Sequence, residues 1–277
     1  MLRRHLLLVG SLAWGGSAAA LAQAAKASPD DPESSPMWHK LRQQLYEGRS
    51  IQADARISLQ APRRADDPAY VPLALHVAPG ATAADDIRRL TLLIDNHPTP
   101  IAAIVELPPG GALADLETRV RLDEYTFVRA LAETADGRVL MATRYVKASG
   151  GCSAPPGGDE AAMRAAMGRM LFRLEGQMPT AAGEPMTVQW MMSHPNHSGM
   201  AMNQLTRTFT PSEFVRTLRI YQGDRLLLSA NVDFALSENP SLRFRFVPQG
   251  SAPLRAEVED NNERHFSAQA ALDSLAR

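Results

Sequence analysis

The chain has 277 residues, a formal net charge of −1 and one cysteine. Basic and acidic residues are nearly balanced, so the composition gives no electrostatic reason to expect a nucleic-acid partner. The length suits one large domain or two modest ones, and a single cysteine excludes a disulfide within the chain.

The first residues, 1–22, have the pattern of a secretory signal peptide. Arg3 and Arg4 precede an apolar run that ends in Ala20-Leu21-Ala22, so we expect cleavage after Ala22. No later stretch is a long apolar run, which predicts no membrane span once the signal is removed. Residues 23–36 are polar and rich in Pro, Ser and Asp, which predicts a disordered leader.

The first half of the remaining chain has the pattern of a short helix followed by strands. Residues 37–46 place Trp38, Leu41 and Leu45 on one face of a helix. Strand patterns follow at 55–59, 70–77, 90–95, 101–107, 117–123, 127–134 and 138–147. Asp136-Gly137 joins the last two and indicates a hairpin. Short strands at this spacing predict an antiparallel β-sandwich.

The second half repeats this organisation. Residues 159–176 space Met163, Met167, Leu171 and Leu174 as on a helix that packs on a core, although the run "RMLFRL" at 169–174 also suits a strand. Further strand patterns lie at 186–194, 213–222, 225–236 and 242–247, and in the last of these Leu242, Phe244 and Phe246 alternate with arginines. The fold class is therefore all-β, with two sandwich domains and short N-terminal and inter-domain helices.

The single cysteine lies in the run "KASGGCSAPPGG" between the two halves. Gly150, Gly151 and Ser153 surround Cys152 with residues that bury little surface, which predicts an exposed, reactive thiol. A free cysteine is also a small hydrophobe that packs well in a core, so a buried, inert thiol is the alternative. An exposed thiol in an oxidising compartment could also link two chains through a Cys152–Cys152 disulfide.

A copper site is one alternative chemistry. His194, His197, Met192 and Met200 cluster in "WMMSHPNHSGMAM", and imidazole and thioether groups are copper ligands. The spacing is not a specific signature, and methionines commonly fill gaps in a core. The sequence predicts no resident cofactor apart from this alternative.

A cysteine hydrolase is the second alternative, whereas a carrier is the chemistry that the residues around Cys152 fit best. A hydrolase needs a thiolate, a histidine base such as His194, His197 or His265, and an oxyanion hole, all held rigidly. Glycines and prolines around Cys152 are poor supports for that geometry, so the sequence predicts a protein that is not an enzyme. A carrier needs a thiol that reaches into partner enzymes, and flanking glycines remove bulk and widen the accessible backbone conformations.

The order of these segments resembles a known family. "RLTLLIDNHPTPIAAIVEL" (89–107), "TRVRLDEYTFVRALAETADGRVLMATRYVK" (118–147) and "VKASGGCS" (146–153) resemble the Y subunit of the Sox thiosulfate-oxidising carrier, which ends in a Gly-Gly-Cys-Gly-Gly arm. His194-Pro195, Gly199 and "SENPSLRF" (237–244) resemble its Z subunit. The whole is similar to the fused quinoprotein dehydrogenase-associated SoxYZ-like carrier proteins.

The resemblance implies more than the residues alone. It implies immunoglobulin-like sandwiches at 37–149 (Y-like) and 159–277 (Z-like), joined by a carrier arm at 150–158, in a periplasmic protein. Cys152 would be the covalent attachment point for sulfur intermediates, with Gly150, Gly151 and Ser153 forming its arm. The implied partners are periplasmic sulfur- or alcohol-oxidising enzymes, of the Sox type or associated with a pyrroloquinoline-quinone (PQQ) dehydrogenase.

The arm departs from the family in one respect. In the two-subunit carrier it is a free C-terminus, whereas here the chain continues through Pro155-Pro156 into a second domain. A loop tethered at both ends enters a narrow enzyme channel less easily than a tail does. A binding or assembly module for a quinoprotein dehydrogenase, in which Cys152 is incidental, therefore remains an alternative to the carrier.

Overall fold

The computed structural model describes residues 31–155, 159–203 and 206–276 of the chain. Its strands, in chain order, are β1 Ile51–Ala53, β2 Ile57–Gln60, β3 Val71–Val77, β4 Ile87–Ile94, β5 Ile101–Glu106, β6 Ala112–Val120, β7 Thr126–Thr134, β8 Val139–Val146, β9 Met170–Glu175, β10 Met186–Met192, β11 Val215–Gln222, β12 Arg225–Val232, β13 Ser241–Phe246, β14 Leu254–Asp260 and β15 His265–Ala270. The helices are η1 Pro32–Ser34, α1 Pro36–Tyr46, η2 Ala83–Asp85, α2 Glu160–Ala166 and η3 Leu272–Ala276. The expected all-β class with short helices is confirmed.

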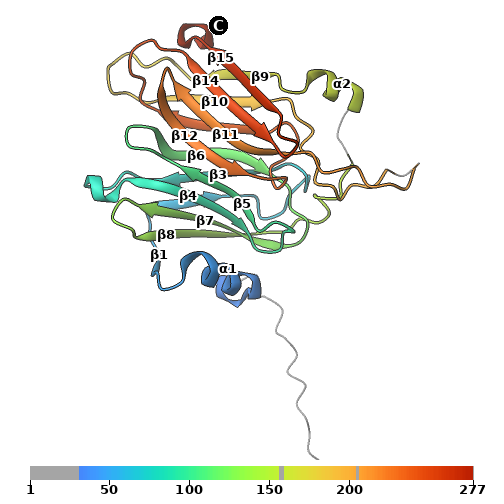
Figure 1. Cartoon of the computed structure of the whole chain (residues 1–277). Coiled ribbons are helices and arrows are strands. Elements are labelled where there is room, and N and C mark those ends of the chain that lie inside the picture. The colour runs from blue at the N-terminus through green and yellow to red at the C-terminus, as the bar shows by residue number, and fades with distance from the viewer. Residues whose placement is uncertain (1–30, 156–158, 204–205, 277) are drawn as a thin grey trace, which may run out of the picture.

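Two sheets run through both halves of the chain (Figure 1). The large sheet has the order β1-β8-β7-β4-β5-β12-β11-β14-β15, and the small sheet has the order β2-β3-β6-β13-β10-β9. The halves meet where β5 pairs with β12 and where β6 pairs with β13, both antiparallel. Backbone hydrogen bonds therefore cross the junction in both layers, and the two sandwich halves are continuous with each other.

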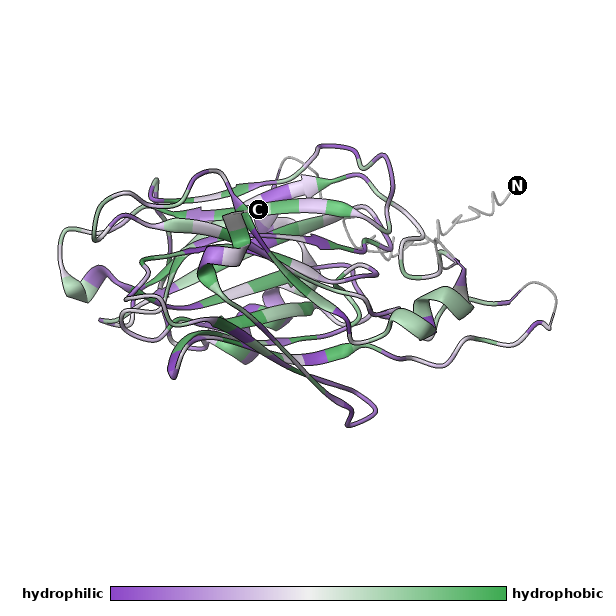
Figure 2. Cartoon of the chain, turned by 90° about the horizontal axis from the view of Figure 1, so that it is seen from above, coloured by the Kyte–Doolittle hydropathy of each residue, from purple (hydrophilic) through white to green (hydrophobic). Residues whose placement is uncertain are grey.

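Apolar side chains from both halves and both sheets form one core. Its buried members include Leu73, Leu92, Trp190 and Leu218, each from a different combination of half and sheet. Every second residue of β10 is buried, as expected for a strand with one face on the core. Figure 2 shows hydrophobic residues spread along the strands, while hydrophilic residues are frequent in the connecting loops.

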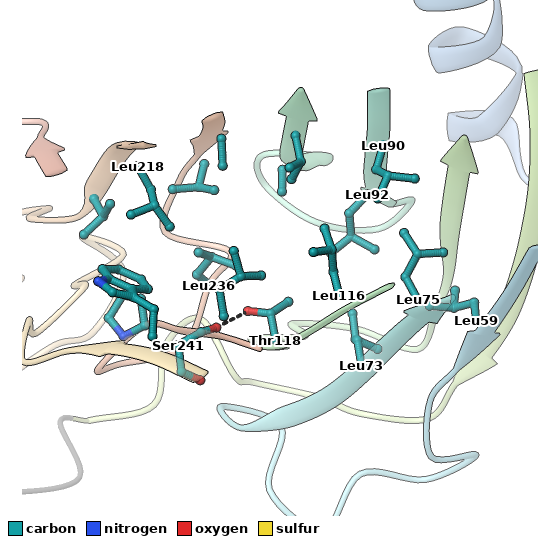
Figure 3. Close-up of a pocket in the computed structure, with 18 residues that line it drawn as sticks. Leu59, Leu73, Leu75, Leu90, Leu92, Leu116, Thr118, Leu218, Leu236 and Ser241 are labelled. Atoms are coloured by element: carbon teal, nitrogen blue, oxygen red, sulfur yellow. Dashed lines mark hydrogen bonds between the residues drawn. The ribbon is translucent and has the colours of Figure 1, made fainter. Parts of the chain in front are cut away.

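A small apolar gap remains inside this core, at the junction of the halves (Figure 3). Its volume is about 60 Å³, and half of the residues that line it are leucines. The Thr118 hydroxyl beside it donates to the Ser241 carbonyl at 2.8 Å. An apolar gap of this kind stays dry and offers no groups for chemistry.

The predicted N-terminal helix is confirmed as α1, which covers the outer face of the large sheet. The Ser35 hydroxyl caps it by accepting the Trp38 amide, and Trp38 and Leu41 pack against Leu93 and Leu131. None of the helices in the described ranges is long and apolar enough to cross a bilayer.

The last residues of the leader at 23–36, which was predicted to be disordered, are ordered in the structure. Residues 31–36 form η1 and the start of α1, because Arg129 donates to the Pro32 carbonyl at 2.7 Å and Glu33 accepts the Trp38 indole N–H. The predicted signal peptide and the rest of the leader lie outside the described residues.

The segment 159–176 forms a short helix followed by a strand, as the alternative prediction for "RMLFRL" had it. The helix α2 ends at Ala166, and Gly168, at a φ of 85°, turns the chain into β9, so "RMLFRL" is a strand. The sequence patterns did not reveal β14 and β15. The strand β15 is a sheet edge with half-exposed residues and little apolar content, which weakens its pattern.

Candidate functional site

Cys152 lies in a tight turn that follows β8 and is buried. Only 1% of the residue is exposed, so the expectation of an exposed thiol is wrong for this conformation. The Gly150 amide donates to the Asp123 carbonyl at 2.8 Å, and the Gly151 amide donates to the Leu122 carbonyl at 2.9 Å. Residues 150–153, which we call the cysteine turn, are therefore docked on the segment after β6. Residues 156–158 of the predicted arm lie outside the described residues.

The two glycines make this docking possible in different ways. A Cβ on Gly151 would lie 2.2 Å from the Pro68 carbonyl oxygen and 2.6 Å from that of Leu122, so no other residue fits there without moving the backbone. Gly150 has a φ of 82°, which favours glycine, but a Cβ there would have only the Ser153 hydroxyl within 4 Å, at 3.9 Å. That hydroxyl donates to the Gly150 carbonyl at 3.2 Å. Gly151 thus serves close packing rather than freedom of movement.

The thiol of Cys152 contacts a buried histidine. Its Sγ lies 3.2 Å from Nε2 of His97, which sits in the turn between β4 and β5. The other ring nitrogen, Nδ1, lies 2.8 Å from the Thr99 carbonyl oxygen, and the ring packs on Phe234 with centroids 5.5 Å apart. The Thr99 amide also donates to Nδ1 at 3.0 Å, so the tautomer of the ring decides whether Nε2 donates to the Cys152 sulfur or accepts its proton.

The electrostatic environment keeps this pair neutral. The pKa of Cys152 is raised from 9.0 to about 12, chiefly by burial and also by the carboxylates of Asp123 and Asp233, while Arg121 acts in the opposite direction. Burial also lowers the pKa of His97. Because both shifts disfavour charge, the site contains a thiol and an imidazole rather than a thiolate and an imidazolium.

The second half of the chain closes the site through residues 194–198. The Ser198 hydroxyl donates to the Cys152 carbonyl. Arg121, which directly follows β6 of the first half, donates from Nη1 to the Asn196 carbonyl of this segment at 2.8 Å and to the Leu236 carbonyl at 2.6 Å. Both halves therefore hold the cysteine turn.

A cavity of about 100 Å³ adjoins the thiol. It is large enough for several water molecules or a small adduct on the sulfur. The polar residues of its wall are Asp67, Tyr70, Arg121, Cys152, His197, Ser198 and Glu238.

Two of the four candidate copper ligands, His194 and Met192, have other roles in the structure. His194 Nε2 lies 3.5 Å from Asp260 Oδ2, and its Nδ1 accepts the Asn196 amide at 3.0 Å. Met192 is buried in the core, whereas Met200 is only partly buried. No group of three or more His, Cys, Asp or Glu side chains suited to a metal occurs within the described ranges.

Sequence reasoning found Cys152 but missed His97, Asp123 and Ser198 around it. His97 lies 55 positions before the cysteine, and Ser198 lies 46 positions after it. The one available signal for His97 was a histidine in a short turn between two apolar strands.

Each half of the chain matches a known protein family. Residues 42–152 match the family described as sulfur oxidation protein SoxY, and residues 175–271 match the family described as sulphur oxidation protein SoxZ. Comparison with curated protein sequences gives no significant match.

Two solved structures illustrate the structural similarities. The sulfur carrier protein SoxY from Chlorobium limicola f thiosulfatophilum is 15% identical over 40% of this chain and 91% of its own, with a TM-score of 0.33. A beta-glycosidase from Bacteroides vulgatus is 8% identical over 84% of this chain and 26% of its own, with a TM-score of 0.24. From the two family matches, the chain joins a SoxY-type domain, whose match ends at Cys152, to a SoxZ-type domain.

Proposed function

We propose that the protein is a non-enzymatic periplasmic carrier that holds sulfur-containing intermediates covalently on Cys152. The observation that carries this proposal is that the SoxY match ends at the only cysteine of the chain, and that this cysteine lies where the two domains meet. The signal-like residues 1–22 support export.

Loading requires the cysteine turn to leave its docked position. The thiolate is the reactive form of cysteine, and the docked thiol is both covered and held neutral. Once undocked, the thiol would titrate near its ordinary value of 9.0 and could attack or accept a cargo. The partners would be sulfur-oxidising enzymes or, as an extension, a PQQ dehydrogenase system. A disulfide between two chains would need the same opening.

Intact-mass spectrometry of protein purified from its native periplasm tests the carrier. We expect a mass increase that a reducing agent removes and that Cys152→Ser protein lacks. An unmodified thiol under both sulfur-oxidising and alcohol-oxidising conditions would refute the proposal, as would normal growth of cells that carry Cys152→Ser.

Burial of the thiol favours a second candidate function. If Cys152 is only a packing residue, the protein is a binding or assembly module for a quinoprotein dehydrogenase. In that case Cys152→Ser protein captures the same partners in a pull-down and supports full pathway activity. Loss of pathway activity with retained partner binding would instead favour the carrier.

A further inference from the structure

The docked cysteine turn is held by contacts from both domains, and these contacts use its backbone more than its sulfur. The Gly150 and Gly151 amides bond to the first domain, the Cys152 amide donates to Asp123 Oδ1 at 3.3 Å, and Ser198 of the second domain holds the Cys152 carbonyl. The sulfur itself contacts only His97 by a described hydrogen bond. The turn can therefore dock with a modified sulfur, provided that the modification suits the surroundings.

Those surroundings are unfavourable to negative charge. The charged groups that act on the sulfur are the carboxylates of Asp123 and Asp233 and the guanidinium of Arg121. Arg121 is also shared with three backbone carbonyls of the second domain through its Nη1. Glu238 adds a further carboxylate to the wall of the adjoining cavity. An anion on the sulfur would face more negative than positive charge in a buried setting.

Size, by contrast, does not prevent a small adduct. The cavity of about 100 Å³ beside Cys152 offers space for a group of a few atoms. Charge, rather than bulk, therefore distinguishes which forms of the sulfur can remain docked.

We propose that the docked cysteine turn accepts Cys152 only in an uncharged form and that attachment of an anionic group to Sγ releases it. The biological meaning rests on the proposed carrier function: the empty carrier shields its thiol between the two domains, and the loaded carrier presents its cargo. Gly151 allows the cysteine turn to dock, because a residue without a Cβ can make this close backbone contact with Pro68.

An isosteric pair of adducts tests the role of charge. Iodoacetamide and iodoacetate each alkylate the thiolate, so that a carbon–sulfur bond forms, iodide leaves with the electron pair and the thiol proton passes to the buffer. Because the chain has one cysteine, each reagent modifies one position. The products differ only in an amide against a carboxylate.

The readout is hydrogen exchange of the amides of Gly150, Gly151 and Cys152 in the two alkylated proteins at pH 7.5. We expect the carboxamidomethyl protein to keep protection close to that of the unmodified protein. The carboxymethyl protein should exchange these amides at least about tenfold faster, as local opening predicts. Equal protection in both proteins would overturn the proposal, and so would equal loss, because bulk would then decide.

The role of Gly151 in docking is tested by the rate at which iodoacetamide modifies Cys152 in the unmodified protein. Gly151→Ala should react at least about tenfold faster than the natural protein, because its Cβ cannot approach Pro68. Gly137→Ala is the control, since it strains a left-handed hairpin residue whose Cβ meets nothing within 4 Å. If Gly151→Ala does not fold, Ser198→Ala replaces it and should also accelerate the reaction. An unchanged rate in a folded variant would contradict the claim that these contacts hold the cysteine turn in its docked position.

These measurements can fail separately from the carrier proposal. A native protein without a sulfur adduct would refute the carrier but leave the charge response intact. Equal exchange in the two alkylated proteins would refute the charge response, even where native sulfur adducts are found.

Discussion

The pH dependence of Cys152 alkylation is the most direct consequence of the site. Burial raises the pKa of the docked thiol from 9.0 to about 12, chiefly through loss of solvent. An exposed cysteine reacts faster with rising pH only until its thiolate is fully formed, near its ordinary pKa. The docked thiol should behave differently, because it reacts only through the open form.

The magnitude follows from the shift. Three pH units correspond to a thiolate fraction about a thousandfold lower in the docked form, so full ionisation of the thiol weakens docking by up to about 4 kcal/mol. Below pH 9 the thiol is neutral in both forms, so docking keeps its full free energy. As the pH rises from 9 towards 12, the open form ionises first, and docking loses about 1.4 kcal/mol per pH unit.

The assay is the second-order rate of iodoacetamide alkylation between pH 6 and 11, followed by intact mass. We expect the logarithm of the rate to continue rising above pH 9 in the folded protein, whereas the same chain in denaturant levels off near pH 9. A folded protein whose rate levels off at the same pH as the denatured chain would refute the argument that burial holds the thiol neutral.

Two further predictions concern buried charges elsewhere in the structure. Asp95→Ala should lower the free energy of unfolding by about 3–5 kcal/mol in urea titration, because it leaves the fully buried Arg129 without its carboxylate partner at 2.7 Å. The control Asp115→Ala removes the partner of the partly exposed Arg245 and should lower the free energy of unfolding by only about 0–1 kcal/mol. Similar losses in the two variants would contradict the argument that burial makes the Asp95–Arg129 pair important. Burial raises the pKa of Asp233 from 3.8 to about 6, so the natural protein should lose stability as the pH rises from about 4 to 6, and Asp233→Asn should remove that slope while keeping an acceptor for the Ala235 amide; an unchanged slope in thermal unfolding would count against it.

Much of the fold could be predicted from local patterns. Leu242, Phe244 and Phe246 are buried on one face of β13, as their alternation indicated, because one side of the strand lies on the core. The alternation cannot name the neighbouring strand, however. The pairing of β13 with β6 makes the two halves continuous, and it depends on contacts between residues more than 100 positions apart, such as Arg243 and Glu117.

For the candidate site, too, local features could be read from the sequence, whereas contacts between distant residues could not. That Cys152 is the only thiol, that small residues flank it and that it lies between two β domains could be concluded from the sequence. The burial of the thiol, by contrast, depends on contacts between segments that are distant in the sequence. Docking depends on the approach of Gly151 to the Pro68 carbonyl, on His97 against the sulfur and on Ser198 from the second domain. Glycine permits both a mobile loop and a close backbone contact, and only the surrounding fold selects between them.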